Sequence, residues 1–104
     1  MKLRVYKVRE GAKLPERSHP SDAGMDLFFC PDDGQPVNIL ERMGAVLGTG
    51  LKIGVPPGFM LEIKNRSSVA SRKSLVVGAC VVDSGYDGEI FVNLNNIGWS
   101  TQMI

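Results

Sequence analysis

The stretch GACVVDSGYDGEI, residues 78–90, places a turn signal between two apolar runs and sets the fold class of this chain. The runs cover residues 75–82 and 89–94, and Ser84-Gly85 lies between them. Apolar runs joined in this way are typical of a β-hairpin, so we predict one here, with Gly85 at a positive φ angle. Asp83 directly follows the first run. We therefore expect its carboxylate to be buried, although desolvation makes that costly.

The rest of the chain is predicted to form further short strands between firm turns. Strand-like segments occur at residues 3–6, 37–40, 51–55 and 59–63, and turn signals at residues 31–34 and 56–58. Only residues 67–73 look helical, with serines to cap the helix. Many short strands with frequent turns indicate a β-sandwich or barrel. A chain of 104 residues is long enough for one domain and too short for two.

Composition excludes several classes of partner. The formal net charge is +1 and 43% of the residues are hydrophobic, so no broad basic or acidic surface is expected. This argues against direct nucleic-acid binding and against an anionic membrane as partner. The N-terminal MKLRVYKVRE alternates apolar and charged residues and is neither a signal peptide nor a membrane span. Cys30 and Cys80 form no CxxC motif, so we predict reduced, structural cysteines in a cytosol-like compartment rather than a disulfide.

Three short motifs combine residues that are suited to phosphate chemistry. AGMDL (residues 23–27) places Asp26 among small and apolar residues, and NRSSVA (residues 65–70) opens the predicted helix with a guanidinium and two hydroxyls. The hairpin stretch carries Asp83. Taken singly, each has a structural explanation: an Asp that caps a turn, a serine N-cap beside a solvated Arg, and an Asp bonded to its own turn. Together they supply a metal-binding acid, a phosphate-binding helix start and a general base. These are the parts of a phosphate-hydrolysis or phosphoryl-transfer site without a Walker loop.

With these motifs the chain resembles the trimeric dUTPase family. AGMDL is similar to the family's first motif, NRSSVA to its second and GACVVDSGYDGE to its third, in the same order over residues 1–95. The resemblance implies an all-β fold, a distorted jelly-roll-like barrel or sandwich with one short helix. We expect residues 1–104 to be a single such domain without the family's fourth motif, Gly-Asp-x-Ile-Ala-Gln, and its fifth, a Gly-rich arm with a Phe. Cys80 stands where the family commonly has Gly, and Asp87 where Arg is common.

The resemblance assigns the chemical step to Asp83. As the general base, Asp83 would activate a water that attacks the α-phosphorus of dUTP and yields dUMP and pyrophosphate. That activity limits uracil incorporation into DNA and supplies dUMP for thymidylate synthesis. The hairpin main chain would read the edge of uracil and exclude cytosine, while Tyr86 would pack under the deoxyribose and exclude a 2′-hydroxyl. The residues expected to contact the nucleoside are Gly78, Ala79, Cys80, Val82 and Tyr86.

The resemblance also implies how the phosphates, the metal and the subunits are arranged. Arg66, Ser67 and Ser68 would bind the phosphate chain, and Asp26 would act on Mg²⁺ through the ion's water ligands. The sites would lie between the subunits of a homotrimer, where the second motif of one chain faces the third motif of its neighbour. We expect a cytoplasmic protein, or one of the host cytoplasm if the source is viral.

Alternatives remain at this stage. A dCTP deaminase shares the fold and an Arg-Ser-Ser segment, but it needs a Glu where this chain has Asn93, which argues against deamination. A non-catalytic nucleotide-binding or regulatory protein on the same fold is a second alternative. In a third, the sequence is an incomplete stretch of a normal enzyme, because residues 99–104 end as if entering another strand. We expect His19 to be a plain loop residue, and Trp99 to pack in the core or an interface.

Overall fold

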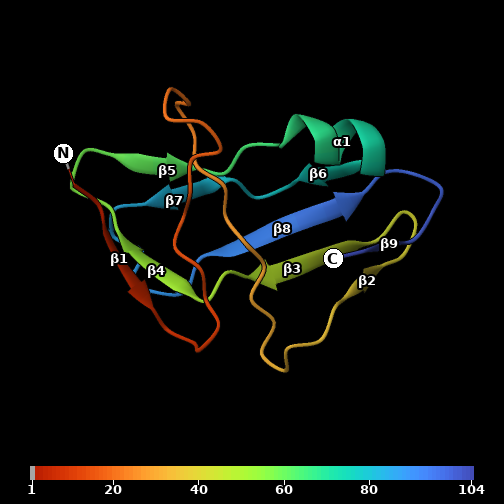
Figure 1. Cartoon of the computed structure of the whole chain (residues 1–104), viewed down its shortest axis with the longest axis horizontal. Helices are drawn as coiled ribbons and strands as arrows, with labels where there is room; N and C mark the ends of the chain where they lie inside the picture. The colour runs from red at the N-terminus through yellow and green to blue at the C-terminus, as the bar shows by residue number, and fades with distance from the viewer. Residues whose placement is uncertain (1) are drawn as a thin grey trace.

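The computed structural model describes residues 2–104, which form short β-strands and a single short helix (Figure 1). The predicted mostly-β fold is therefore confirmed. The strands are β1 (Arg4–Lys7), β2 (Asn38–Ile39), β3 (Gly44–Gly48), β4 (Leu51–Gly54), β5 (Met60–Glu62), β6 (Leu75–Val77), β7 (Val81–Asp83), β8 (Phe91–Asn96) and β9 (Gln102–Met103), and the helix is α1 (Ser67–Lys73).

The described strands pair only in antiparallel fashion, as several small sheets. β8 is the central strand of the largest sheet, between β3 and β6, and Figure 1 shows α1 beside β6. β1 pairs with β4, β2 with β9, and β5 with β7. Since β7 has a strand partner on one side only, its other edge is open among the residues that the structure describes.

The predicted hairpin across Ser84-Gly85 is wrong. Residues 75–83 divide into two strands, of which β6 pairs with β8 and β7 pairs with β5. The chain thus changes sheets between them. Val82 belongs to a buried cluster with Ile53 and Ile90, whereas Leu75 belongs to another, with Ile39 and Leu47. Because the two ends of the apolar run are anchored in different clusters, they cannot form one strand. Gly85 is also not among the glycines with positive φ, and its turn closes through a Tyr86 N–H to Asp83 C=O hydrogen bond of 3.1 Å.

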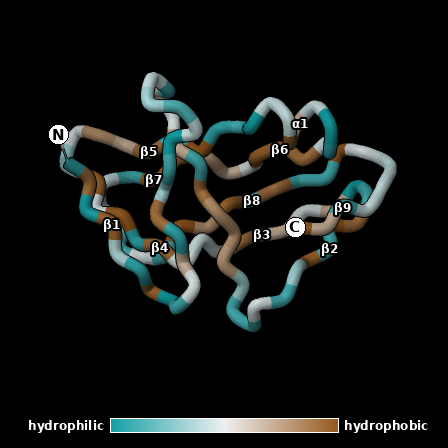
Figure 2. The backbone as a smooth tube through the Cα atoms, in the orientation of Figure 1, coloured by the Kyte–Doolittle hydropathy of each residue, from teal (hydrophilic) through white to brown (hydrophobic). Residues whose placement is uncertain are grey.

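The core consists of small buried clusters, and Figure 2 shows hydrophobic residues along β4, β6 and the start of β8. A third cluster of buried residues joins Ala12, Cys30 and Leu51. Cys30 and Cys80 are both free, as predicted. Trp99 was predicted to pack either in the core or in an interface, and the first of these is wrong, because 80% of the residue is exposed. The Arg42 guanidinium carbon lies over its ring, 5.3 Å from the ring centroid.

Helix α1 has the predicted bounds but not the predicted cap. Arg66 is its N-cap residue, with extended φ and ψ of −86° and 128°, and no side chain makes a capping hydrogen bond. Ser67 and Ser68 lie inside the first turn and are exposed. Their hydroxyls are therefore not used to cap the helix. Within residues 2–104, no helix combines the length and apolarity that crossing a membrane requires.

Candidate active site

The first and second motifs line one pocket, of about 560 Å³, which we call the acid–arginine pocket. Asp26 and Arg66 meet there, with an Nη1–Oδ2 distance of 3.8 Å. The Ser18 hydroxyl donates to the same Asp26 oxygen at 3.0 Å. The Asp26 side chain thus contacts a hydroxyl and a guanidinium. These contacts differ from those of an Asp that only caps a turn, which was the purely structural explanation for this residue. Apolar side chains such as Leu75 and Val92 form the rest of the lining.

The backbone holds Asp26 firmly while leaving its carboxylate accessible. Asp26 N–H donates to the Glu16 carbonyl at 2.7 Å, and Glu16 N–H donates to the Asp26 carbonyl at 3.2 Å. The Asp26 side chain is 24% exposed and that of Arg66 is 62% exposed. An ion pair this long and this exposed adds little stability, so the guanidinium is free to move to an anionic ligand.

The acidic residues that line this pocket, Asp22, Asp26 and Glu62, are not grouped as a set of metal ligands. No group of three or more His, Cys, Asp or Glu side chains capable of holding a metal occurs in residues 2–104. Water molecules and a substrate would therefore supply most of the ligands of an ion bound at Asp26. Mg²⁺ behaves in this way, because it dehydrates reluctantly and is often bound through one or two carboxylates plus substrate phosphates. The donor set fits Mg²⁺ held through water.

The third motif lines a second, smaller pocket of about 210 Å³, which we call the turn pocket. Asp83 and Tyr86 lie at this pocket together with Ala79, Cys80 and the open edge of β7. Contrary to the prediction, Asp83 is exposed. Side chains alternate along a strand, and in β7 the middle residue, Val82, faces the core, so Asp83 faces outward. The Val82 side chain is buried, so only the main-chain atoms of this residue could make its predicted contact with a ligand.

A close turn fixes the ring of Tyr86 beside this pocket. Its hydroxyl donates to the Glu89 carbonyl at 2.5 Å. The contact requires glycine at residue 88, because a Cβ there would lie 2.8 Å from the Tyr86 hydroxyl oxygen and 3.0 Å from Cζ. Tyr86 is 45% exposed, so part of this residue is accessible to a ligand.

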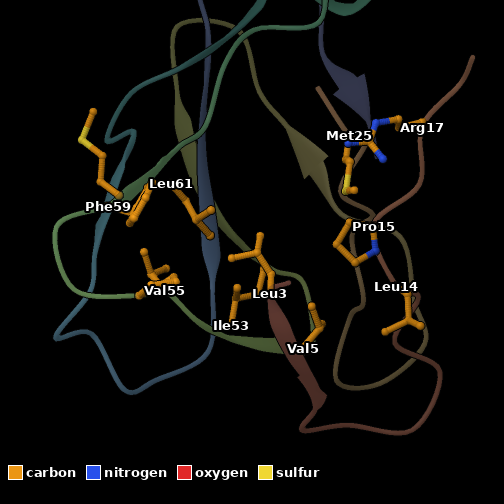
Figure 3. A pocket seen from close by; sticks show the side chains of 12 residues that line it. Leu3, Val5, Leu14, Pro15, Arg17, Met25, Ile53, Val55, Phe59 and Leu61 are labelled. Atoms are coloured by element: carbon orange, nitrogen blue, oxygen red, sulfur yellow. The ribbon is translucent and has the colours of Figure 1, made fainter. Parts of the chain in front are cut away.

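A larger pocket than either of these lies elsewhere. It measures about 680 Å³ and is formed by β1, β4, β5 and the loop around Leu14 (Figure 3). Figure 3 shows Leu3, Val5, Ile53 and Leu61 grouped around it, and Arg17 is its one charged side chain. A mostly apolar pocket whose lining includes no carboxylate or imidazole has no general base to activate water. The candidate active site is therefore the two smaller pockets, in spite of their size.

The structure divides the predicted site residues into two groups within the chain. Asp26 and Arg66 line the acid–arginine pocket, and Asp83 and Tyr86 line the turn pocket. Ile63 contributes to both pockets. Ser67 and Ser68 are exposed and line neither pocket, and Gly78 lies at the exposed bend between β6 and β7. The acid–arginine half and the Asp83 half are thus formed by separate parts of the surface.

Residues 10–104 match the family model for dUTPase. The chain belongs to the dUTPase family. It is 34% identical over 98 residues to the deoxyuridine 5′-triphosphate nucleotidohydrolase of Clostridium acetobutylicum, a match that covers 92% of this chain and 65% of that protein.

Solved dUTPase structures share the fold. A mutant dUTPase from phage phi11 of S. aureus, described for its coordination of a structural Mg(II) ion, matches with a TM-score of 0.83 and 32% identity. The match covers 93% of this chain and 61% of that one. A mutant dUTPase from Staphylococcus bacteriophage 80alpha, bound to dUpNHpp, has a TM-score of 0.83 and 30% identity over 94% of this chain and 61% of that chain. The predicted jelly-roll-like β fold is confirmed, and the chain spans less than two thirds of the length of each of these three proteins.

One interaction in this dUTPase-family chain was missed by sequence reasoning, because its members lie far apart in the sequence. The Glu89 carboxylate accepts from Arg9 Nη1 and Nη2, both at 2.8 Å, and from Gly50 N–H at 3.0 Å. The hydrogen bonds from Arg9, more than that from Gly50, lower the pKa of Glu89 despite its desolvation. The same contacts raise the pKa of Arg9. Glu89 thereby ties the third motif to the N-terminal segment, while its carbonyl holds Tyr86.

Sequence reasoning also did not identify two asparagines that hold the bend between β6 and β7. Asn65, within the second motif, accepts from Val77 N–H at 2.7 Å, next to the bend at Gly78. Asn93, noticed in the sequence only because a deaminase would have Glu there, contacts the same bend. A polar side chain in an otherwise apolar strand pattern is the signal that could have indicated the second link.

Proposed function

We propose that this protein hydrolyses dUTP to dUMP and pyrophosphate in a Mg²⁺-dependent reaction, as part of a homotrimer. One observation carries the proposal. An accessible carboxylate, Asp83, lies in one pocket with an open strand edge and a half-exposed tyrosine ring. That combination offers a base, a hydrogen-bonding edge and a stacking surface within the reach of one nucleotide.

The base and the sugar bind in the turn pocket. Uracil presents a donor between two acceptors along its pairing edge, and cytosine has a different pattern. The main-chain groups of residues 78–82 that Asn93 and β5 do not already bind would pair with the pattern of uracil, so binding would discriminate against the base whose groups stay unpaired. The Tyr86 ring, held by Gly88 and the Glu89 carbonyl, supports the deoxyribose and leaves no space for a 2′-hydroxyl.

The phosphates bind at the acid–arginine pocket and at the helix start. Arg66 exchanges its long contact with Asp26 for phosphate oxygens, and the exposed Ser67 and Ser68 hydroxyls donate to the same chain. When bound, Mg²⁺ would supply positive charge to these oxygens, and Asp26 would hold it through water. Asp83 takes the proton from the attacking water as the α-phosphorus is attacked, and its accessible carboxylate suits this role.

Assembly joins the two halves. Within one chain, Arg66 and Asp83 line different pockets, and a site that needs both is completed when a neighbour supplies one of them. The bound dUpNHpp of the phage 80alpha relative and the Mg(II) of the phi11 relative support the nucleotide and the metal. The free thiols of Cys30 and Cys80 suit a reducing compartment and support a cytoplasmic location.

Pyrophosphate release tests the proposal. The purified full chain is assayed with Mg²⁺ and dUTP, dCTP or UTP, and Asp83→Asn is the control because it keeps shape and removes the base. We expect release from dUTP in preference to the other two, and a fall in kcat of about 100-fold or more in Asp83→Asn with KM little changed. Equal rates for the two proteins would rule out Asp83 as the base, and equal rates with dUTP and dCTP would rule out base reading by residues 78–82.

A further inference from the structure

Asn93 lies in the middle of β8 and forms hydrogen bonds with β3 on one side and with the bend that follows β6 on the other. Its side-chain Nδ2 donates to the Ala45 carbonyl of β3 at 3.3 Å. On the opposite side, its Oδ1 accepts from Ala79 N–H at 3.2 Å and its main-chain carbonyl accepts from Gly78 N–H at 2.8 Å. One residue therefore binds two successive N–H groups of the bend between β6 and β7, and is itself anchored to the central sheet.

The bend packs directly onto this amide. A Cβ at Gly78 would overlap Asn93 Oδ1 and would lie 2.8 Å from Asn95 Nδ2. Only glycine allows the chain to approach so closely. Val77, the residue before the bend, is held in turn by Asn65 Oδ1. Three consecutive N–H groups, at residues 77–79, are thus bound by two asparagines.

We propose that Asn93 is the positioning residue for base selection, because it fixes the orientation of the peptides that inspect the pyrimidine. The inference rests on the function proposed above. Hydrogen-bond readout needs groups held within a fraction of an ångström, yet Gly78 and Ala79 lie at an exposed bend beyond the end of β6, where Asn93 supplies the hydrogen bonds to their N–H groups. Without the hydrogen bond from Ala79, the peptide that joins Gly78 to Ala79, which contains the Ala79 N–H, can rotate. The adjoining groups then no longer match uracil better than cytosine.

Three variants separate positioning from general stability. Asn93→Leu keeps the branched shape of the side chain, with larger methyl groups, and removes both side-chain hydrogen bonds. Asn93→Asp keeps the acceptor for Ala79 N–H but sets a second oxygen against the Ala45 carbonyl, so it should lower thermal stability. Asn95→Leu is the matched control, two residues along the same strand and beside Gly78, because the hydrogen bonds that hold Gly78 and Ala79 come from Asn93.

The first measurement is amide hydrogen exchange of Ala79 in the ligand-free protein, and the second is kcat and KM for dUTP and dCTP. In Asn93→Leu we expect the exchange rate of the Ala79 amide and the KM for dUTP each to rise about tenfold, as for the loss of one hydrogen bond. The kcat should stay within about threefold of the wild-type value, and the selectivity for dUTP over dCTP should fall. Asn95→Leu should match wild type. Asn93→Asp should keep KM and selectivity close to wild type despite its lower melting temperature.

The outcomes also separate this inference from the proposed function. If wild type shows no preference for dUTP over dCTP, the proposed function fails. If wild type prefers dUTP but Asn93→Leu keeps wild-type exchange at Ala79 or wild-type KM, the positioning role alone is overturned. It is overturned as well if KM simply follows thermal stability, so that Asn93→Asp is impaired as much as Asn93→Leu.

Discussion

Replacing Gly88 by alanine should displace the Tyr86 ring with little loss of stability. The added Cβ would lie 2.8 Å from the Tyr86 hydroxyl oxygen, 3.0 Å from Cζ and 3.4 Å from Cε1. To restore an ordinary separation of about 3.4 Å or more, the end of the ring must move by roughly 0.6 Å, which lengthens and weakens its hydrogen bond to the Glu89 carbonyl. The ring is 45% exposed and can turn outward, so the cost should be no more than that of one hydrogen bond, about 1 kcal/mol.

The effect on sugar selection should be larger than the effect on stability. Misplacing a group by about 1 Å can reduce activity by up to about 100-fold, so a shift near half of that should raise the KM for dUTP roughly tenfold. Discrimination against UTP should fall, because the displaced ring no longer fills the space of a 2′-hydroxyl. Steady-state pyrophosphate release with dUTP and UTP, together with thermal denaturation, measures both effects.

Two controls make the result decisive. Tyr86→Phe removes the hydroxyl and its hydrogen bond but keeps the ring, so it should lose stability without losing selectivity. Gly85→Ala lies in the same turn, where an added Cβ meets nothing within 4 Å, and should behave as wild type. If Gly88→Ala retains the wild-type preference for dUTP over UTP, Tyr86 does not exclude the 2′-hydroxyl and the sugar-binding role given to it is wrong.

Two further predictions concern the ion pair and the assembly. Glu89→Gln should lower the melting temperature by at least about 4 °C, since it weakens the contacts to Arg9 and Gly50. Because the folded state lowers the pKa of Glu89, the contribution of this carboxylate to the free energy of unfolding is complete above the unfolded pKa of 4.5 and is lost as the pH falls through the folded pKa. The denaturation curves of wild type and Glu89→Gln should therefore converge in acid and stay apart at neutral pH. Asp83→Asn and Arg66→Ala subunits, each inactive alone, should regain activity when unfolded together and refolded as a mixture, since some sites then combine two intact halves. No recovery in trimers shown by mass to contain both chains would place each site within one subunit.

Local patterns predicted much of this molecule correctly. The bounds of α1 follow from a short stretch of helix-compatible residues, and β1, β2, β4 and β5 fall within or overlap the predicted segments because alternation marks a half-buried strand. β3 was missed, since GAVLG begins and ends with glycine, which weakens a strand pattern. The pairing of Asp26 with Arg66 could be expected only from the resemblance, because the two residues lie 40 positions apart in the sequence.

The sequence by itself determined the fold class, the helix and the identity of the groups available for chemistry, because these depend on residue type and on short-range periodicity. Only the tertiary structure decided that the apolar run splits between two sheets, that Asp83 faces outward, and that Arg9 reaches Glu89 from 80 residues away. Periodicity shows which side chains share a face, but the partner of a strand depends on which buried cluster its side chains can join. In this chain, Val82 and Leu75 join different clusters, and Asn93 holds the bend that lies between them.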